Sequence, residues 1–371
     1  MTLAYRVEGV PGAPSLVLLN SIGATTGMWD GLAPALAERF RLIRIETRGH
    51  GGSPTPPATG PVTLADLAAD VLAVLDELGV NRAHVAGLSL GGLTALWLAA
   101  HAPHRVGRIA VLCAAIDQRR QKWQDRAAAV RAGGLDTVAE QTVPVWLTAA
   151  AIDRDPELAR RCREMLAGAD PEGYAQCCEV LADLAIRADL PAIDVPTLAI
   201  AGADDPAAPT EQLREVADLV PGARLAVVGP AAHVATFEQP AAITALLSEH
   251  FAPSGETTRR EVLGDAHVER AAAGTTEFTA PFQQFLTRYA WGEVWNRPGL
   301  PRRDRSIATL AALTALGAEP EIGMHVRAAL RNGLTREEIA EVLLHTAVYA
   351  GLPRANQAFA AAARVLDETP G

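Results

Sequence analysis

The chain has 371 residues, enough for about two domains. Hydrophobic residues make up 49% of it and charged residues 20%, a balance that supplies material for buried cores and excludes extended disorder. The net charge is −10 and no cluster of Lys and Arg has the pattern of a phosphate-binding track, which argues against a nucleic-acid partner. No apolar stretch reaches the roughly 18 residues of a membrane-spanning helix, and the first residues lack the pattern of a signal peptide. We therefore expect a soluble, cytoplasmic protein that binds no membrane.

Residues 1–251 alternate short β-rich runs with helical patterns, as a mostly parallel sheet flanked by helices does. The patterns at 64–78 and 91–101 predict two of the helices. Six runs predict strands: Ser15–Leu19, Arg41–Glu46, Ala83–Gly87, Arg108–Cys113, Thr197–Ala201 and Arg224–Val228. From about 115 to 187 the alternation gives way to polar-faced helical sequence. This stretch predicts an inserted helical cap over the carboxyl edge of the sheet, with Trp146 as a candidate for contact with a substrate.

The segment Gly87-Leu88-Ser89-Leu90-Gly91 directly follows a predicted strand and opens a predicted helix. In that setting G-x-S-x-G forms a strained strand-to-helix turn that holds the serine hydroxyl out over the sheet edge. An ordinary glycine-rich turn has the same composition, so the segment alone does not decide between them. The residues that follow along the chain favour Ser89 as a nucleophile.

A serine nucleophile needs a general base, and the base needs an anion that orients it. The loops after the last two predicted strands carry Asp204 and Asp205, and then His233. This order of Ser, Asp and His matches hydrolases whose serine lies on a strand-to-helix turn. We prefer Asp205 to Asp204 because the related pattern is Gly-x-x-Asp before a proline-containing turn. The alternative for His233 is an ordinary histidine of a surface loop.

An acyl transfer also needs N–H donors for the oxyanion that develops on the carbonyl. The backbone N–H of Leu90 lies at a predicted helix N-terminus, whose dipole favours negative charge. The loop Asn20-Ser21-Ile22-Gly23 follows the first predicted strand and offers the N–H of Ile22 as the second donor. Such a loop is also compatible with a simple turn.

Several segments carry a family resemblance: LLNSIG at 18–23, TRGHGGS at 47–53, GLSLGG at 87–92, GADDPAAP at 202–209 and the His233 loop. Through them, residues 1–250 resemble the α/β-hydrolase superfamily. LNS-x-G followed by Met28-Trp29 is more similar to 3-oxoadipate enol-lactonases than to esterases at large. Glu46 departs from the family pattern, in which many members have Asp before the T-R-G-H-G run. That run is structural, so the departure leaves the expected chemistry unchanged.

After Phe251 the polar stretch 252–258, which contains Pro, Ser and Gly, predicts a linker. Beyond it the pattern changes, because residues 259–371 contain only helix-like segments and predict an all-α second domain. The expected helices are 261–272, 276–291, 302–316, 319–332, 335–350 and 354–367. Thr335 and Glu338 have the spacing of a capping box at the start of one of them.

Two sets of helix-borne side chains in this second domain have the spacing of one helical turn. They are Glu321 with His325, and Glu341 with His345 and Tyr349. Either set suits acid–base chemistry, and either is equally compatible with a solvent-facing ion pair or a core histidine. The residues alone therefore leave the function of the domain open.

Segments of the second domain are similar to 4-carboxymuconolactone decarboxylases nearly end to end: EVLGDAHVERA at 261–271, FTAPFQQFLTRYAWGEVWNRPGL at 278–300, RRDRS at 302–306, MHVRAALRNGLTREEIAEVLLHTAVYAGLP at 324–353 and AN at 355–356. Those decarboxylases resemble the alkylhydroperoxidase-D-like helical fold. The peroxidases of that fold use a Cys-x-x-Cys pair, but residues 259–371 contain no cysteine, which excludes thiol redox chemistry in this domain.

The resemblance implies loss of carbon dioxide from a butenolide carboxylate, with the ring carbonyl as electron sink. We therefore expect no metal and no organic cofactor, and the chain's four cysteines also lack the spacing of metal ligands. Arg302, Arg303 and Arg305 suit bidentate binding of the substrate carboxylates, although they are equally compatible with surface charge. His325 and Glu293 are the acid–base candidates.

The two resemblances name consecutive steps, because the product of the decarboxylase is the enol-lactone that the hydrolase opens. They imply a bifunctional enzyme of the protocatechuate branch of the β-ketoadipate pathway, acting on small lactone carboxylates. The alternative is a general esterase or perhydrolase whose second domain only mediates oligomerisation. In either case the apolar helices 302–316 and 335–350 predict a homo-oligomer held together by residues 259–371.

Overall fold

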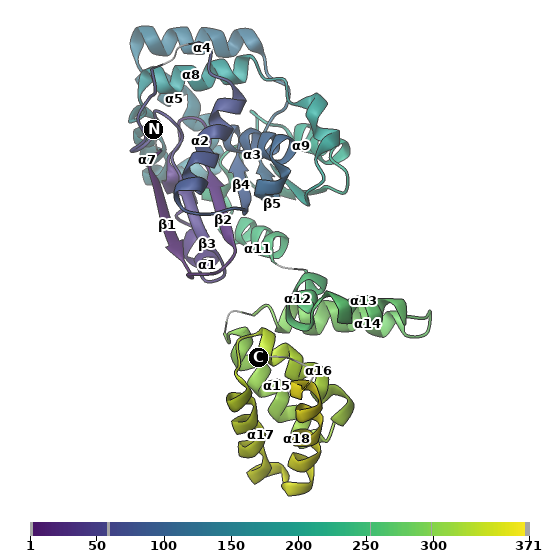
Figure 1. Ribbon diagram of the computed structural model, residues 1–371. Helices are drawn as coiled ribbons and strands as arrows, with labels where there is room; N and C mark the ends of the chain where they lie inside the picture. Colours follow the sequence, from purple (N-terminus) through teal and green to yellow (C-terminus); the bar gives the residue numbers. More distant parts are fainter. Residues whose placement is uncertain (1–2, 58–59, 253, 298, 368–371) are drawn as a thin grey trace. The chain divides into compact units, whose positions relative to one another are not determined.

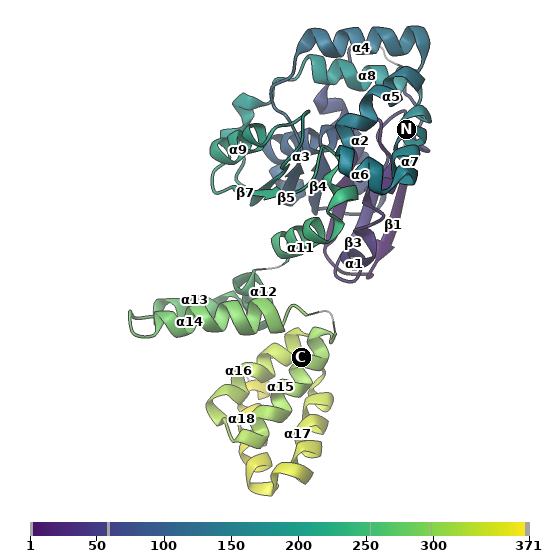
Figure 2. The same ribbon diagram turned by 180° about the vertical axis from the view of Figure 1, so that it is seen from behind.

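A seven-stranded sheet forms the centre of the first part of the chain in a computed structural model that describes residues 3–57, 60–252, 254–297 and 299–367. The chain divides into two units, Met1–Phe251 and Ala252–Gly371, which we name unit 1 and unit 2. Figures 1 and 2 show the ribbon from opposite sides. Over the described residues, unit 2 has helices and no strand. The predicted fold classes of both parts are thereby confirmed.

The sheet has the strand order β1-β3-β2-β4-β5-β6-β7, and only β1 runs antiparallel to its neighbour. The bounds are β1 (Tyr5–Gly9), β2 (Ser15–Leu19), β3 (Arg41–Ile45), β4 (Ala83–Leu88), β5 (Val106–Leu112), β6 (Thr197–Gly202) and β7 (Arg224–Val228). The six predicted strands agree with β2 to β7 within two residues. β1 was not predicted, because it is a largely exposed edge strand with two charged residues and therefore has no apolar run.

Helices cover the sheet because its inner strands are apolar on both faces, as parallel strands between helices are. The central helix α3 (Leu90–His101) packs against β2, β4 and β5 and is buried almost all round. The other elements outside the cap are η1 (Thr26–Trp29), α1 (Ala33–Ala37), α2 (Leu64–Glu77), η2 (Pro103–Arg105), η3 (Arg187–Ala192), α9 (Thr210–Leu219), α10 (Ala235–Glu238) and α11 (Pro240–Phe251). Thr63 and Asp66 form a capping box that starts α2.

The cap lies between β5 and β6 in the sequence and is entirely helical. Its helices are α4 (Arg120–Gly133), α5 (Asp136–Trp146), α6 (Ala149–Arg154), α7 (Pro156–Ala167) and α8 (Pro171–Ala182). In both views α4 and α8 lie side by side at one end of unit 1 (Figures 1 and 2). Asp155 and Asp170 cap the helices that follow them, each by accepting from a backbone N–H of the first turn.

Unit 2 begins with α12 (Gly255–Leu263), α13 (Asp265–Ala273), α14 (Ala280–Leu286) and the π-helix η4 (Thr287–Val294). These are followed by α15 (Arg302–Leu316), α16 (Glu319–Arg331), α17 (Arg336–Ala350) and α18 (Leu352–Asp367), which share a core built around Leu310, Val326 and Leu343. A smaller cluster with Val262 and Trp291 packs α12 and η4 against α16. No described helix combines the length and apolarity that crossing a lipid bilayer demands.

The predicted linker 252–258 is wrong over its second half, because α12 already begins at Gly255. Ser254 is its N-cap, and the side chain accepts from the N–H of Thr257 at 3.0 Å. Serine and glycine are common in loops, which explains why the composition of this stretch suggested a linker.

Candidate active sites

Ser89 lies at the sharp turn between β4 and α3, with φ 56° and ψ −114°. A positive φ is strained for a residue with a side chain, and two glycines make room for the turn. A Cβ atom on Gly87 would lie 2.1 Å from the carbonyl oxygen of Gly91, and one on Gly91 would lie 2.5 Å from that of Leu19. The N–H of Ser89 donates to the carbonyl of Leu112 at 2.8 Å. Ser89 is therefore fixed at the carboxyl end of the sheet.

His233 and Asp205 form a buried pair on the loops after β7 and β6. Nδ1 of His233 donates to Oδ2 of Asp205 at 2.9 Å, and Oδ1 of Asp205 accepts from the N–H groups of Ala207 at 2.8 Å and Ala208 at 3.0 Å. Burial alone would raise the pKa of Asp205, but His233 and the two N–H donors hold it below its usual value. The ionised carboxylate can thus orient the imidazole and stabilise its protonated form.

The neighbouring Asp204 has a different partner. Its Oδ2 accepts from the N–H of Ala231 at 3.1 Å, and its own N–H donates to the carbonyl of Ala231 at 2.9 Å. Asp204 therefore fastens the loop that carries His233, whereas Asp205 contacts the ring.

A cavity of about 260 Å³ between the sheet edge and the cap is lined by both Ser89 and His233. Trp123, Trp146 and Tyr174 supply its aromatic walls. The cap is tied to the histidine loop, because the N–H of His233 donates to the carbonyl of Val145 at 3.4 Å and that of the next residue donates to Trp146 at 3.0 Å. The volume approaches the lower end of the range usual for small-molecule sites.

Two cations of α4, Arg126 and Lys122, line this cavity, and among the described residues no Asp or Glu does. The guanidinium of Arg126 lies 5.6 Å from the ring centre of Trp123 and 5.7 Å from that of Tyr174, and its Nη2 donates to the hydroxyl of Thr142. Its Nε is buried without a hydrogen-bond partner, and no described acidic side chain forms an ion pair with it. Burial and the nearby Arg126 also lower the pKa of Lys122. The cavity is thus suited to an anionic ligand.

The two amides expected to form an oxyanion hole are those of Ile22 and Leu90. Ile22 lines the cavity beside Ser89, and Leu90 is the first residue of α3. Within the described part of the chain neither N–H has a hydrogen-bond partner. Both donors are therefore available to a ligand oxygen.

The loop that carries Ile22 is held by Glu46, just before the T-R-G-H-G segment, and by His50 within it. Glu46 accepts from Nδ2 of Asn20 at 3.1 Å and from the hydroxyl of Thr26 at 2.8 Å. Nε2 of His50 accepts from the N–H of Gly23 at 2.9 Å. Burial lowers the pKa of His50, which keeps that nitrogen unprotonated and able to accept. Glu46 and His50 therefore act by positioning the oxyanion loop.

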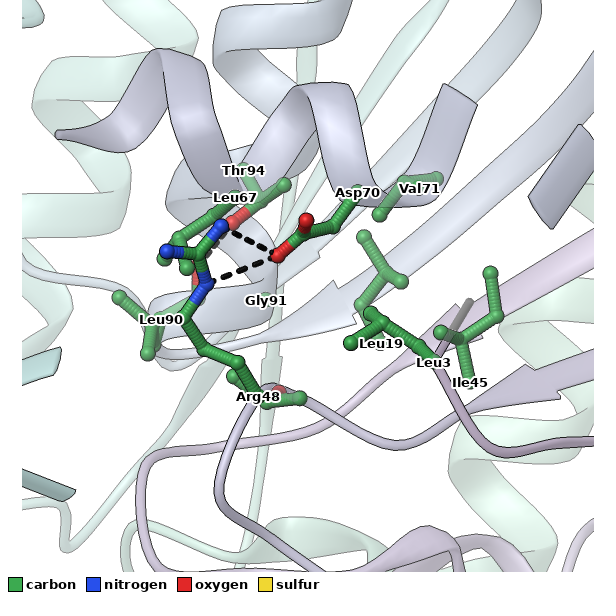
Figure 3. A pocket seen from close by; sticks show the side chains of 11 residues that line it. Leu3, Leu19, Ile45, Arg48, Leu67, Asp70, Val71, Leu90, Gly91 and Thr94 are labelled. Atoms are coloured by element: carbon green, nitrogen blue, oxygen red, sulfur yellow. Dashed lines mark hydrogen bonds and ion pairs between the residues drawn. The ribbon is translucent and has the colours of Figure 1, made fainter. Parts of the chain in front are cut away.

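A small void of about 20 Å³ lies behind the first turn of α3 (Figure 3). Arg48 and Asp70 border it, with Nη2 and Oδ2 2.6 Å apart, and the pair joins the T-R-G-H-G loop to α2. Leu90 and Gly91 form another side of the void. Its volume suffices for about one water molecule, so we interpret it as a packing feature that supports the turn at Ser89.

The five decarboxylase candidates of unit 2 are not joined to one another by any hydrogen bond or ion pair in its described part. Arg302 pairs with Glu261 and Arg303 pairs with Glu338. Arg305 donates to two backbone carbonyls, at 3.1 Å and 2.7 Å. All three arginines therefore already hold a partner.

The acid–base candidates of unit 2 differ in their environment. His325 on α16 is half-buried, and burial together with His267 on α13 lowers its pKa to about 4. It is thus neutral at physiological pH. Glu293 on η4 is exposed, and the set containing His345 and Tyr349 lies on the outer face of α17, where Tyr349 is 78% exposed.

Comparison with known proteins matches each unit to a family. Residues 14–240 match the model of the alpha/beta hydrolase fold, and residues 280–364 match that of the carboxymuconolactone decarboxylase family. The chain is 37% identical over 243 residues to 3-oxoadipate enol-lactonase 2 of Acinetobacter baylyi. This match covers 65% of this chain and 90% of the relative. The chain is 49% identical over 114 residues to 4-carboxymuconolactone decarboxylase of the same species, covering 31% of this chain and 85% of the relative.

The chain belongs to the α/β-hydrolase family and to the carboxymuconolactone decarboxylase family. The predicted recognition of both families is confirmed. Among solved structures, the enol-lactonase from Burkholderia xenovorans resembles the hydrolase unit with a TM-score of 0.66 and 37% identity. That match covers 68% of this chain and 96% of the other.

Arg126 of the hydrolase unit was not predicted from the sequence, and neither were His267 and Arg259 of the decarboxylase-family unit. Arg126 follows Trp123 by three residues on α4, a spacing that places both on one helix face. That spacing was the one available signal, and it does not show that the face lines a cavity.

Proposed function

We propose that this chain catalyses two consecutive reactions. Its decarboxylase-family unit converts 4-carboxymuconolactone to 3-oxoadipate enol-lactone, and its hydrolase unit opens that lactone to 3-oxoadipate. One observation carries the proposal: a single chain joins a unit similar to an enol-lactonase to a unit similar to the enzyme that makes the lactone. Two unrelated activities would not be expected to match in this way.

In the hydrolase unit, Ser89 is the nucleophile and attacks the lactone carbonyl while His233 accepts its proton. Asp205 orients the imidazole, and the N–H groups of Ile22 and Leu90 stabilise the oxyanion. Collapse of the tetrahedral intermediate breaks the ring C–O bond and gives an acyl-enzyme. The leaving enolate takes the proton from the imidazolium and tautomerises to the ketone. Water, activated by His233, then releases 3-oxoadipate.

The substrate of this step carries a carboxylate, and the cavity supplies a matching charge. We assign its binding to Arg126, because the buried Nε lacks a partner and no acidic side chain lines the cavity in the part of the chain that the structure describes. The rings of Trp123 and Tyr174 fix the guanidinium plane, and Trp146 contributes a further apolar wall. The chain thereby orients the lactone carbonyl toward Ser89.

In the decarboxylase-family unit, cleavage of the C–C bond to the departing carboxylate leaves an electron pair. That pair moves through the ring double bond to the lactone carbonyl oxygen, and a proton then adds to the carbon next to the carbonyl. The net reaction consumes one proton and releases carbon dioxide. The three arginine candidates Arg302, Arg303 and Arg305 already hold partners, and Glu293 is exposed. A neutral His325 is not the acid that this protonation requires, so we assign none of the five candidates a step of the reaction.

We also propose that residues 259–371 carry the contacts of a homo-oligomer. Large apolar side chains with high exposure follow one another from the turn before α14 into η4: Phe278 92%, Phe282 62%, Phe285 51% and Tyr289 50%. Such a row on a helical surface is usually covered by a partner.

The decisive experiment follows 4-carboxymuconolactone in the presence of the intact protein. The wild type should release carbon dioxide and form 3-oxoadipate, and Ser89→Ala should release carbon dioxide but accumulate the enol-lactone. No consumption of 4-carboxymuconolactone by the wild type would leave only an esterase with a helical oligomerisation domain.

A further inference from the structure

The decarboxylase-family unit contains an open cavity of about 600 Å³ formed by α12, α13, α14 and the start of η4. The helices α12, α13 and α14 lie together in both ribbon views (Figures 1 and 2). The volume is that of a typical small-molecule site. None of the five decarboxylase candidates named from the sequence lines it.

Arg259 lines this cavity and is only 8% exposed. Its Nη1 donates to Oε1 of Gln283 at 3.0 Å and to the hydroxyl of Thr287 at 3.3 Å. Its Nε is buried and has no hydrogen-bond partner. Glu256 also lines the cavity, but its carboxylate accepts from the side chain of Arg260 at 3.0 Å. Among the described residues Arg259 forms no ion pair.

A buried guanidinium stays charged, and leaving such a charge without a counter-ion costs free energy. The neutral oxygens of Gln283 and Thr287 orient Arg259 but do not neutralise it. Burial lowers the pKa of Arg259, and the Glu256 carboxylate partly offsets this, but that carboxylate forms its ion pair with Arg260. A second arginine, Arg288, lines the cavity from an exposed position. The cavity therefore offers two cations, one buried and one exposed, to an anionic ligand.

The wall that carries Thr287 is held rigidly against α12. The backbone of Gly255 packs so closely on η4 that a Cβ atom there would lie 1.8 Å from the carbonyl oxygen of Thr287. π-helical turns are infrequent and often occur at functional sites. This contact fixes the distance between α12, which carries Arg259, and the polar groups that orient it.

We propose that this cavity binds the substrate of the decarboxylase-family unit and that Arg259 holds the carboxylate of the carboxymethyl arm. The inference rests on the proposed decarboxylation. A guanidinium bound to the departing carboxylate would lose its counter-ion as carbon dioxide forms, and would stabilise the substrate more than the transition state. The carboxymethyl arm keeps its charge throughout the reaction. Arg259 on that arm binds substrate and transition state equally, and so it lowers KM without raising the barrier.

The test compares Arg259→Met with Arg364→Met in the intact chain carrying Ser89→Ala, so that lactones are not opened. Arg364 is the matched control, because it lies on α18, pairs with Glu319 and does not line the cavity. Carbon dioxide release should show KM raised roughly tenfold to a hundredfold for Arg259→Met, with kcat changed by less than about threefold. Arg364→Met should keep the KM of the parent.

Two saturated lactones identify the carboxylate that Arg259 binds. γ-Butyrolactone-γ-acetate keeps the carboxymethyl arm, and γ-butyrolactone-γ-carboxylate keeps only the carboxylate on the ring carbon. The first should inhibit decarboxylation competitively in the parent and at least about tenfold less strongly in Arg259→Met. The weaker inhibition by the second should be the same in both proteins.

Arg288→Met and Arg259→Lys guard against misfolding as the cause. Arg288 is exposed, so its loss leaves the core intact and should still raise KM. Arg259→Lys should recover part of the inhibition by γ-butyrolactone-γ-acetate that Arg259→Met loses. Unchanged KM and unchanged inhibition in Arg259→Met and Arg288→Met would overturn the inference while the proposed function stands. The wild type could release no carbon dioxide while calorimetry showed that γ-butyrolactone-γ-acetate binds and that this binding depends on Arg259. In that case the proposed function would fail and the binding site would stand.

Discussion

Asp204 and Asp205 are neighbours in the chain, yet their carboxylates hold different parts of one loop. Asp205 accepts from the ring of His233 at 2.9 Å, and Asp204 accepts from the backbone N–H of Ala231 at 3.1 Å. A carboxylate on the ring sets the tautomer of a general base, whereas one on the backbone sets only the course of the loop. The adjacent residues are therefore separable by mutation.

Asp205→Asn should reduce kcat for enol-lactone hydrolysis by roughly a thousandfold or more, because an amide can hold the imidazole in the wrong tautomer. Asp204→Asn should change kcat by less than about tenfold, since its amide oxygen can still accept from Ala231. Steady-state hydrolysis by the two variants checks this. The opposite ranking would move the orienting role to Asp204.

Arg126→Met should raise KM for the enol-lactone roughly tenfold to a hundredfold, because the substrate carboxylate loses its charged partner. Arg120→Met is the matched control on the same helix, where Arg120 pairs with Asp183 at 2.8 Å and does not line the cavity. Equal KM values for the two variants would place the carboxylate elsewhere.

Gly255→Ala should destabilise unit 2 by about 2 kcal/mol or more, because the added methyl group collides with the Thr287 carbonyl. Decarboxylation should be lost while lactone hydrolysis persists. Gly274→Ala is the control, since its Cβ would lie 3.5 Å from the nearest atom and its φ of −85° suits alanine. Urea unfolding with both activities as readouts tests the pair, and a fully active Gly255→Ala protein would contradict the packing argument.

Acid should destabilise unit 1 through two neutral histidines, the half-buried His84 and the buried His250. Burial lowers the pKa of His84 and of His250 from 6.5 to about 4. Between these values the unfolded chain takes up protons that the folded chain does not, so stability falls as the pH falls from 6.5 toward 4. After allowance for partial exposure we expect a loss of about 1–2 kcal/mol per histidine.

The pH dependence of the urea midpoint measures this loss. His84→Gln should flatten the dependence, and a midpoint that stays constant in the wild type over the same window would contradict it.

If unit 2 carries the oligomer contacts, charges on its exposed aromatic row should dissociate the protein. Phe278→Asp combined with Phe282→Asp should lower the mass measured by light scattering, whereas Val10→Asp on unit 1, where Val10 is 45% exposed, should not. Residues 1–251 alone should be monomeric. An oligomer formed by that fragment would place the contacts in the hydrolase unit.

The parts that could be predicted from the sequence are those with local signals. The strand-to-helix turn at Ser89 follows from five consecutive residues, and the inner strands follow from apolar runs. Arg126 and Arg259 could not be predicted, because their neighbours Arg120 and Arg260 have the same side chain on the same helices. Only packing with distant elements buries the Nε of Arg126 and the Nε of Arg259, and a buried Nε without a partner is what distinguishes these two arginines.

The junction between the two units is short, because an ordered residue lies close to it on each side. Phe251 is fully buried in the core of unit 1, where its ring lies 5.4 Å from that of His84, and Ser254 already caps α12 of unit 2. Only two residues of the chain lie between the buried Phe251 and the helix cap Ser254. A chimera that replaces either unit with a separate homologous enzyme should therefore be joined between Phe251 and Ser254. A junction there keeps the core residue of unit 1 and the helix cap of unit 2.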